Sequence, residues 1–138
     1  MDEFLISSAA GDGGLHFFQR SPPDPNKPID GFWVRVTDHN LSAAAQVYGG
    51  YVPSHPASLF ADMARQWAGW SGELEWQSLE GELTIRCSRD RFGHIFIRLE
   101  LRSGHMPEDW RVVATVMAEA GQLEGIALRA EMFFGRVG

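Results

Sequence analysis

The sequence predicts an α+β fold: a single antiparallel sheet of about seven or eight strands with two helices packed on one face. Most of the chain alternates apolar and polar residues with the period of two that is typical of half-buried strands. Two other segments place apolar residues at the spacing of a helical stripe. The expected strands follow one another through short turns, and such connections favour antiparallel neighbours.

The N-terminal half is expected to supply the first strands. A glycine turn at 11–14 separates two short apolar runs, which suggests a hairpin. The segment 21–31 holds four of the seven prolines and is expected to be a loop, because proline lacks the N–H that a ladder needs. The alanines of 41–48 favour a helix, but the short turn before this segment and its terminal Val47 and Tyr48 favour a strand. The expected strands here are 4–7, 15–19, 32–37 and 41–48.

A helix is expected after Ser54, which can cap it, with Pro56 in its first turn, where a missing N–H is harmless. Gly69 and Gly72 are expected to end it, because glycine accepts the left-handed conformation. The predicted buried stripe is Leu59, Phe60, Met63, Ala64 and Trp67.

The C-terminal half returns to the strand period. The expected strands are 74–77, 83–88, 94–102 and 110–117. Because 110–117 is apolar on both faces, it is expected to be a central strand. A second helix is expected at 119–134. Its predicted stripe is Leu123, Ile126, Ala127, Ala130, Phe133 and Phe134.

Three tryptophans lie close together in the sequence, and they suggest either an aromatic binding platform or part of the core. Trp67 falls on the stripe of the first helix, and Trp76 is in phase with Leu74, so both are expected to be buried. Trp70 lies in the glycine turn between them and is expected to be the most exposed of the three.

Composition restricts the classes of partner. The 138 residues suit one domain, expected at 1–138, with 44% hydrophobic and 22% charged residues. The net charge of −6 with no basic run argues against nucleic acid. A single cysteine, an acidic N-terminus unlike a signal peptide, and apolar runs too short to span a bilayer predict no membrane association and a cytoplasmic protein.

No familiar catalytic or metal-binding pattern is present. The five histidines have no metal-ligand spacing, so neither a metal nor another cofactor is expected. Cys87 alternates with Leu83 and Ile85, which predicts a small buried hydrophobe and not a nucleophile. No catalytic residue is therefore predicted. The acidic residues Glu73, Glu75, Glu80 and Glu82 are expected mostly on a solvated face.

The strands of the C-terminal half place arginines on their polar phase. Arg86, Arg98, Arg102 and Arg111 share this phase with apolar residues and acids. The members of this mixed set besides arginine are Glu82, Glu100, Phe96, Val113 and Met117. Such a face is either an ordinary solvated surface or a partner surface, where arginine is enriched. Trp33 is out of phase with its apolar neighbours and is expected to join it, which predicts partner binding by Trp33, Arg86, Arg98 and Arg102.

A resemblance covers residues 67–127. The stretch WAGWSGELEWQSLEGELTIRCSRDRFGH, followed by DWRVVATVMAEAGQLEGIA, resembles a bacterial family catalogued as domain of unknown function 6228. The pattern is W-x-G-W, then L-x-W-x-S-L-E-G-x-L, then G-H, then E-A-G-Q-L. In size and in strand–helix order, such families are similar to small bacterial immunity proteins, but the resemblance implies no established activity.

These observations predict a non-catalytic protein-binding module, of the immunity or antitoxin kind, whose partner is another protein or a second copy of itself. Two alternatives remain open. One is a small enzyme whose site is assembled from residues such as His94, Asp90 and Glu100. The other is a structural protein that self-associates through the arginine-bearing face.

Overall fold

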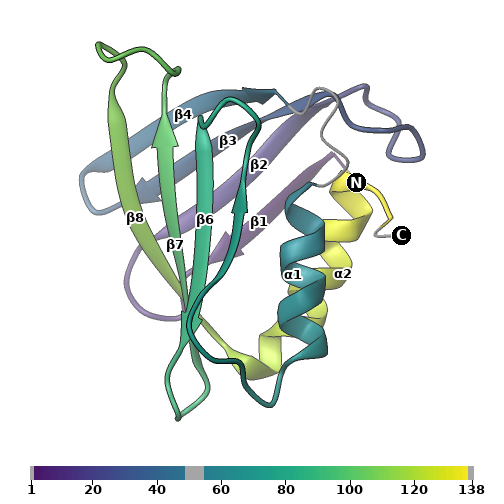
Figure 1. Cartoon of the computed structure of the whole chain (residues 1–138), viewed down its shortest axis with the longest axis vertical. Helices are drawn as coiled ribbons and strands as arrows, with labels where there is room; N and C mark the ends of the chain where they lie inside the picture. Colours follow the sequence, from purple (N-terminus) through teal and green to yellow (C-terminus); the bar gives the residue numbers. More distant parts are fainter. Residues whose placement is uncertain (1, 49–54, 137–138) are drawn as a thin grey trace.

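The computed structural model describes residues 2–48 and 55–136, and within them it has two antiparallel four-stranded sheets and two α-helices (Figure 1). The first sheet has the order β1 (Glu3–Ser7), β2 (Gly14–Ser21), β3 (Gly31–Asp38) and β4 (Leu41–Tyr48). The second has the order β5 (Leu74–Gln77), β6 (Leu83–Arg89), β7 (His94–Arg102) and β8 (Arg111–Glu119). The helices are α1 (Pro56–Arg65) and α2 (Leu123–Phe134), and the short 3₁₀ turn η1 (Ala120–Gln122) precedes α2.

The α+β class and the antiparallel pairing are confirmed, but the expected single sheet is wrong. Eight strands side by side would span about 35 Å, whereas helices of 10 and 12 residues are only about 15 and 18 Å long. Two such helices could not cover that face. Instead, the apolar faces of the two sheets cover each other. The helices pack side by side along one side of the sheets, α1 next to β5 and α2 next to β1 (Figure 1).

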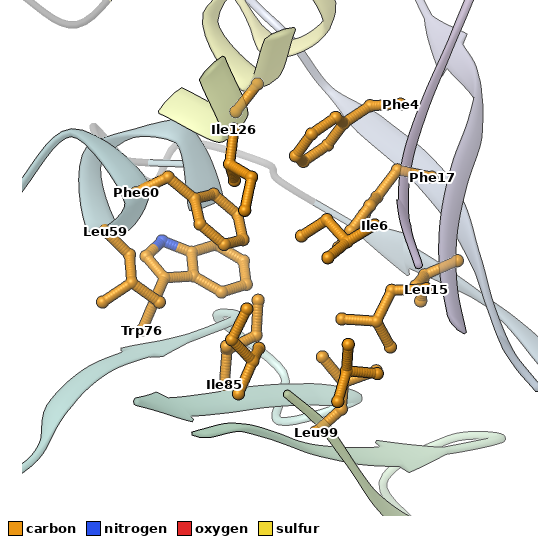
Figure 2. Close-up of a cluster of buried hydrophobic side chains, with 14 of the residues drawn as sticks. Phe4, Ile6, Leu15, Phe17, Leu59, Phe60, Trp76, Ile85, Leu99 and Ile126 are labelled. Atoms are coloured by element: carbon orange, nitrogen blue, oxygen red, sulfur yellow. The ribbon is translucent and has the colours of Figure 1, made fainter. Parts of the chain in front are cut away.

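One hydrophobic core joins all of these elements. Figure 2 shows Phe17 from the first sheet, Ile85 and Leu99 from the second, and Phe60 and Ile126 from the helices pointing into the same interior. Each of these side chains is almost completely buried. Burial of this kind, at roughly 25 cal/mol per Å² of apolar surface, is the main favourable contribution to folding. Both outer sheet faces are therefore turned away from the core.

Most elements lie close to their expected positions, but α2 begins at Leu123 and not at residue 119, because β8 continues to Glu119 and the turn η1 follows it. Helix α1 ends at Arg65, before the glycines that were expected to end it. His55 occupies its N-cap position, and the predicted cap Ser54 lies outside the described residues. Pro56 does lie in the first turn, and the stripe of α2 faces the core as predicted.

The prediction that the last strand is central is wrong, because β8 is an edge strand of the second sheet. The apolar residues on its outer face had suggested that both faces of this strand are covered. The outer face is open to solvent at Val113, which is 39% exposed. In the described ranges, no helix is long and apolar enough to cross a membrane.

Candidate partner-binding surface

The outer face of the second sheet carries four arginines, as the alternation predicts. Arg86 comes from β6, Arg98 and Arg102 from β7, and Arg111 from β8. Arg86 lies directly opposite Arg98, and Arg102 lies directly opposite Arg111. Like charges at directly opposite cross-strand positions oppose folding. This face therefore concentrates positive charge on a chain whose net charge is −6.

Carboxylates neutralise two of these arginines. Arg86 Nε donates to Glu75 Oε2 at 3.1 Å, and this hydrogen bond raises the pKa of the guanidinium. Arg111 Nε lies 3.0 Å from Glu100 Oε1. Both pairs are partly exposed to solvent, where such bridges contribute about 0–1 kcal/mol.

The side chains of the other two arginines form no salt bridge with a described residue, although a hydrogen bond from the Met106 amide, helped by the charge of Arg102, lowers the pKa of Asp109. The side chain of Arg98 is exposed and makes no hydrogen bond or ion pair with any described residue. Arg102 donates from Nη2 to the carbonyl oxygen of Met106 at 3.3 Å, while its Nε is buried without an acceptor in the described part of the chain. The face thus retains unused capacity to bind carboxylates, which guanidinium groups bind with two parallel hydrogen bonds.

Glu82 was expected on this same polar phase, but it is buried at 4% exposure. Its Oε2 accepts a hydrogen bond from the Tyr48 amide at 3.2 Å, and its Oε1 accepts one from Ser78 Oγ at 2.8 Å. The carboxylate is covered because the end of β4, in the other sheet, reaches the start of β6. Glu82 therefore links the two sheets and is not part of the surface.

Trp33 is not brought together with the arginines. It points outward, as predicted, but from β3 in the first sheet. There its ring stacks on Phe18 with centroids 6.3 Å apart, and the Arg35 guanidinium lies 5.0 Å from the Phe18 ring. Alternation gives the direction of a side chain within its own sheet but not which sheet a strand joins.

Of the three predictions about tryptophan exposure, one is confirmed and two are wrong. Trp76 is buried at 7% exposure, as expected, but Trp67 is 66% exposed and that prediction is wrong. Trp67 lies beyond the end of α1, so it leaves the helical stripe on which its burial depended. Trp70 is partly buried: its Nε1 donates to the Cys87 carbonyl oxygen at 3.3 Å. Trp70 is therefore not the most exposed of the three.

The exposed Trp67 lines a groove of about 570 Å³ that the sequence did not predict. The groove lies between the end of α1 and η1. Its other lining residues are Ala64, Arg65, Ala120, Gly121 and Glu124. No local pattern could have indicated it, because it forms where two segments about 55 residues apart in the chain meet.

The residues proposed for an enzyme site come together only in part. His94 Nδ1 lies 2.7 Å from Asp90 Oδ2, whereas Glu100 pairs with Arg111 instead. The hydrogen bond with Asp90 raises the pKa of His94. Desolvation acts to raise the pKa of Asp90, but hydrogen bonds from His94 and Phe92 outweigh it and hold that pKa below its ordinary value. Neither His94 nor Asp90 lines the groove beside Trp67.

Cys87 is buried, as predicted, and burial raises the pKa of its thiol to about 12. A thiol that stays protonated at neutral pH is a poor nucleophile. Among the described residues, no group of three His, Cys, Asp or Glu side chains is arranged to hold a metal ion.

Comparison with known proteins yields a family but no characterised relative. No curated protein matches the chain, and no solved structure does. One family model, described as a family of unknown function (DUF6228), matches residues 6–137. This match extends the resemblance seen at 67–127 over nearly the whole sequence, so the chain belongs to the DUF6228 family.

Proposed function

We propose that this protein acts by binding another protein and not by catalysis, in the manner of immunity and antitoxin proteins. The observation that carries the proposal is the arginine face of the second sheet, defined as Arg86, Arg98, Arg102 and Arg111. Two of its guanidiniums, those of Arg98 and Arg102, form no salt bridge in the described part of the chain, although the chain has 18 acidic residues. A partner protein that presents carboxylates would provide acceptors for these two guanidinium groups.

The energetics favour a partner over a merely solvated surface. In each opposed pair Glu75 or Glu100 offsets the charge of one arginine, and a bound carboxylate would offset the charge of the other while forming charge-assisted hydrogen bonds. Local potential guides docking, so the overall charge of −6 does not oppose it. Exposed Val113 adds the apolar contact that interfaces combine with arginine. We extend the proposal to a cytoplasmic partner, since a free buried Cys87 suits a reducing compartment.

A small enzyme remains the second candidate, because His94 and Asp90 form an imidazole–carboxylate pair. This pair can orient a base, but no nucleophile among the described residues is hydrogen-bonded to it. Self-association through the arginine face is the third candidate. It would place eight guanidiniums in one interface, four from each copy, and like charges at an interface disfavour that pairing.

The test compares capture of a binding partner from lysate of the native host by the wild type and by R86A/R98A/R102A. A matched control is R65A/R91A/R129A, which removes the same charge from exposed arginines elsewhere. We expect the first variant to lose the partner and the control to keep it. Circular dichroism checks that all three proteins are folded, and light scattering checks for a homodimer.

Added salt provides a second readout. Binding by the arginine face should weaken as ionic strength rises, because surface charges are screened beyond about 8 Å at physiological salt. Equal capture by the wild type and R86A/R98A/R102A, or no partner for the wild type, would show that this surface is not the binding site.

A further inference from the structure

The outer edge of β8 has a row of unused backbone groups. The Met117 amide donates to Ser8 Oγ at 3.1 Å, and the Met117 carbonyl oxygen accepts from the Ala9 amide at 2.8 Å. Both groups therefore point away from β7. Because backbone direction alternates along an antiparallel strand, Arg111, Val113 and Thr115 point their N–H and C=O groups to the same side. In the described part of the chain, nothing bonds to these groups.

This edge lacks the usual protection. Proteins blunt an open edge with charge, proline, a bulge or a covering segment. Between the charged Arg111 and Glu119 at the two ends of β8, the run VVATVM, Val112 to Met117, has no charge and no proline, and it is rich in β-branched residues. Its pairing with β7 is continuous, without a bulge. Residues 8–9 cover only the Met117 end. A strand-forming edge about five residues long is left open.

The side chains next to this edge favour an acidic strand as the ligand. Arg111, Val113 and Thr115 are exposed on the outer face, in the same layer as Arg98 and Arg102. A strand added at this edge would place every second side chain on the outer face of the second sheet, next to Arg111. The Nε of Arg111 already contacts Glu100, so acidic side chains at those positions would pair with its two Nη groups and, one strand further in, with Arg98.

We infer that the open edge of β8 binds an extended acidic segment of the partner protein as an added β-strand. This inference rests on the proposed function and specifies its geometry: backbone hydrogen bonds supply affinity and alternate acidic side chains supply specificity. At the edge of β4, the Tyr48 amide bonds to the Glu82 side chain and not to β3, so the amides of Ser42, Ala44 and Gln46 also face away from β3, and no described residue bonds to them. These outward residues carry no cation to choose an acidic strand.

The test uses a synthetic peptide, acetyl-Thr-Glu-Val-Glu-Val-Glu-Thr-amide, and amide hydrogen exchange read by NMR. With peptide at about ten times its Kd, exchange at Val113 and Thr115 should slow about tenfold. The amides of Ala44 and Gln46 on β4 should not change. A peptide with lysine in place of glutamate should not bind, and one N-methylated at alternate residues should lose binding, because it cannot complete the ladder.

A variant repeats the test from the protein side. V113P removes an amide that makes no bond to β7, so the sheet should survive while peptide binding falls at least tenfold. The matched control is A44P, whose amide faces the open edge of β4, and it should bind the peptide normally. If V113P does not fold, the N-methylated peptide still tests the same bonds on the wild-type protein.

The outcomes separate the two proposals. If the acidic peptide binds but leaves Val113 and Thr115 unprotected, and its N-methylated form binds equally well, strand addition is wrong while the arginine face stands. If the acidic peptide does not bind at all, strand addition is also wrong, and the lysate comparison decides the arginine face separately. Protection that appears without peptide and grows with protein concentration would show pairing with a second copy and would overturn the acidic partner.

Discussion

The Nε of Arg20 donates a hydrogen bond to the backbone carbonyl oxygen of Phe133 at 2.8 Å. Arg20 lies near the end of β2, and Phe133 is in the last turn of α2, so this bond joins the first sheet to the second helix. Arg20 is only 6% exposed, and its guanidinium also donates to four more backbone carbonyls. These acceptors are Pro22, Asp24, Lys27 and Phe134.

Replacement of Arg20 should therefore destabilise the protein strongly. Hydrogen bonds to charged groups contribute about 1.5–3 kcal/mol each, so R20A should lower the free energy of unfolding by about 3 kcal/mol or more. R20K keeps the charge but cannot reach five acceptors, and it should fall between R20A and the wild type. Urea melts measure this, with R129A on the exposed face of α2 as a control that should change little. A loss below about 1 kcal/mol for R20A would contradict the role of this side chain.

Two tryptophan variants should differ sharply. Trp76 is 7% exposed within the core, so W76A should cost about 3–5 kcal/mol. Trp67 is 66% exposed, so W67A should change stability by less than about 1 kcal/mol. Denaturant melts of the two variants give the comparison. Similar losses for both would mean that Trp67 is part of the core.

The His94–Asp90 pair should make stability depend on pH in a defined direction. Its hydrogen bond raises the pKa of His94 above the ordinary 6.5. The folded state then binds the proton more tightly than the unfolded state, so the contribution is complete below about pH 6.5 and is lost as pH rises through the raised pKa. The stability difference between the wild type and H94Q should shrink across that range. D90N should remove this dependence, and a difference that grows with pH would contradict the assignment.

His55 should make the stability of the protein depend on pH in the opposite direction. Burial is the main cause that lowers the pKa of His55 below 6.5, and the charge of Arg20 is the second. The His55 ring stacks on the Phe134 ring, with the two centroids 5.7 Å apart. The unfolded state then takes up the proton first, so this site reduces stability as pH falls from about 6.5 through the lowered pKa. H55F keeps a stacked ring without a titrating nitrogen. Over that range, the wild type should lose more stability than H55F; an equal loss would place the titration elsewhere.

The local sequence pattern was sufficient to predict most of the individual strands and helices. The strand period placed the hairpins, and it gave the outward direction of Arg86 and Arg98 and the inward direction of Cys87. These properties depend on neighbours within a few residues, because successive side chains of a strand point to opposite faces whatever lies beyond it. The helical stripe of α2 was predictable for the same reason.

Partition of the strands between two sheets was decided by contacts across the fold. Alternation is the same for β3 and β7, so it could not show that Trp33 and Arg98 would lie on different sheets. Burial of Glu82 depends on the approach of β4, and exposure of Trp67 depends on α1 ending at Arg65. The sequence alone therefore determined which way each side chain faces along its own element. The assembled core determined which elements became neighbours, because the apolar face of each sheet had to be covered by the other sheet and the helices.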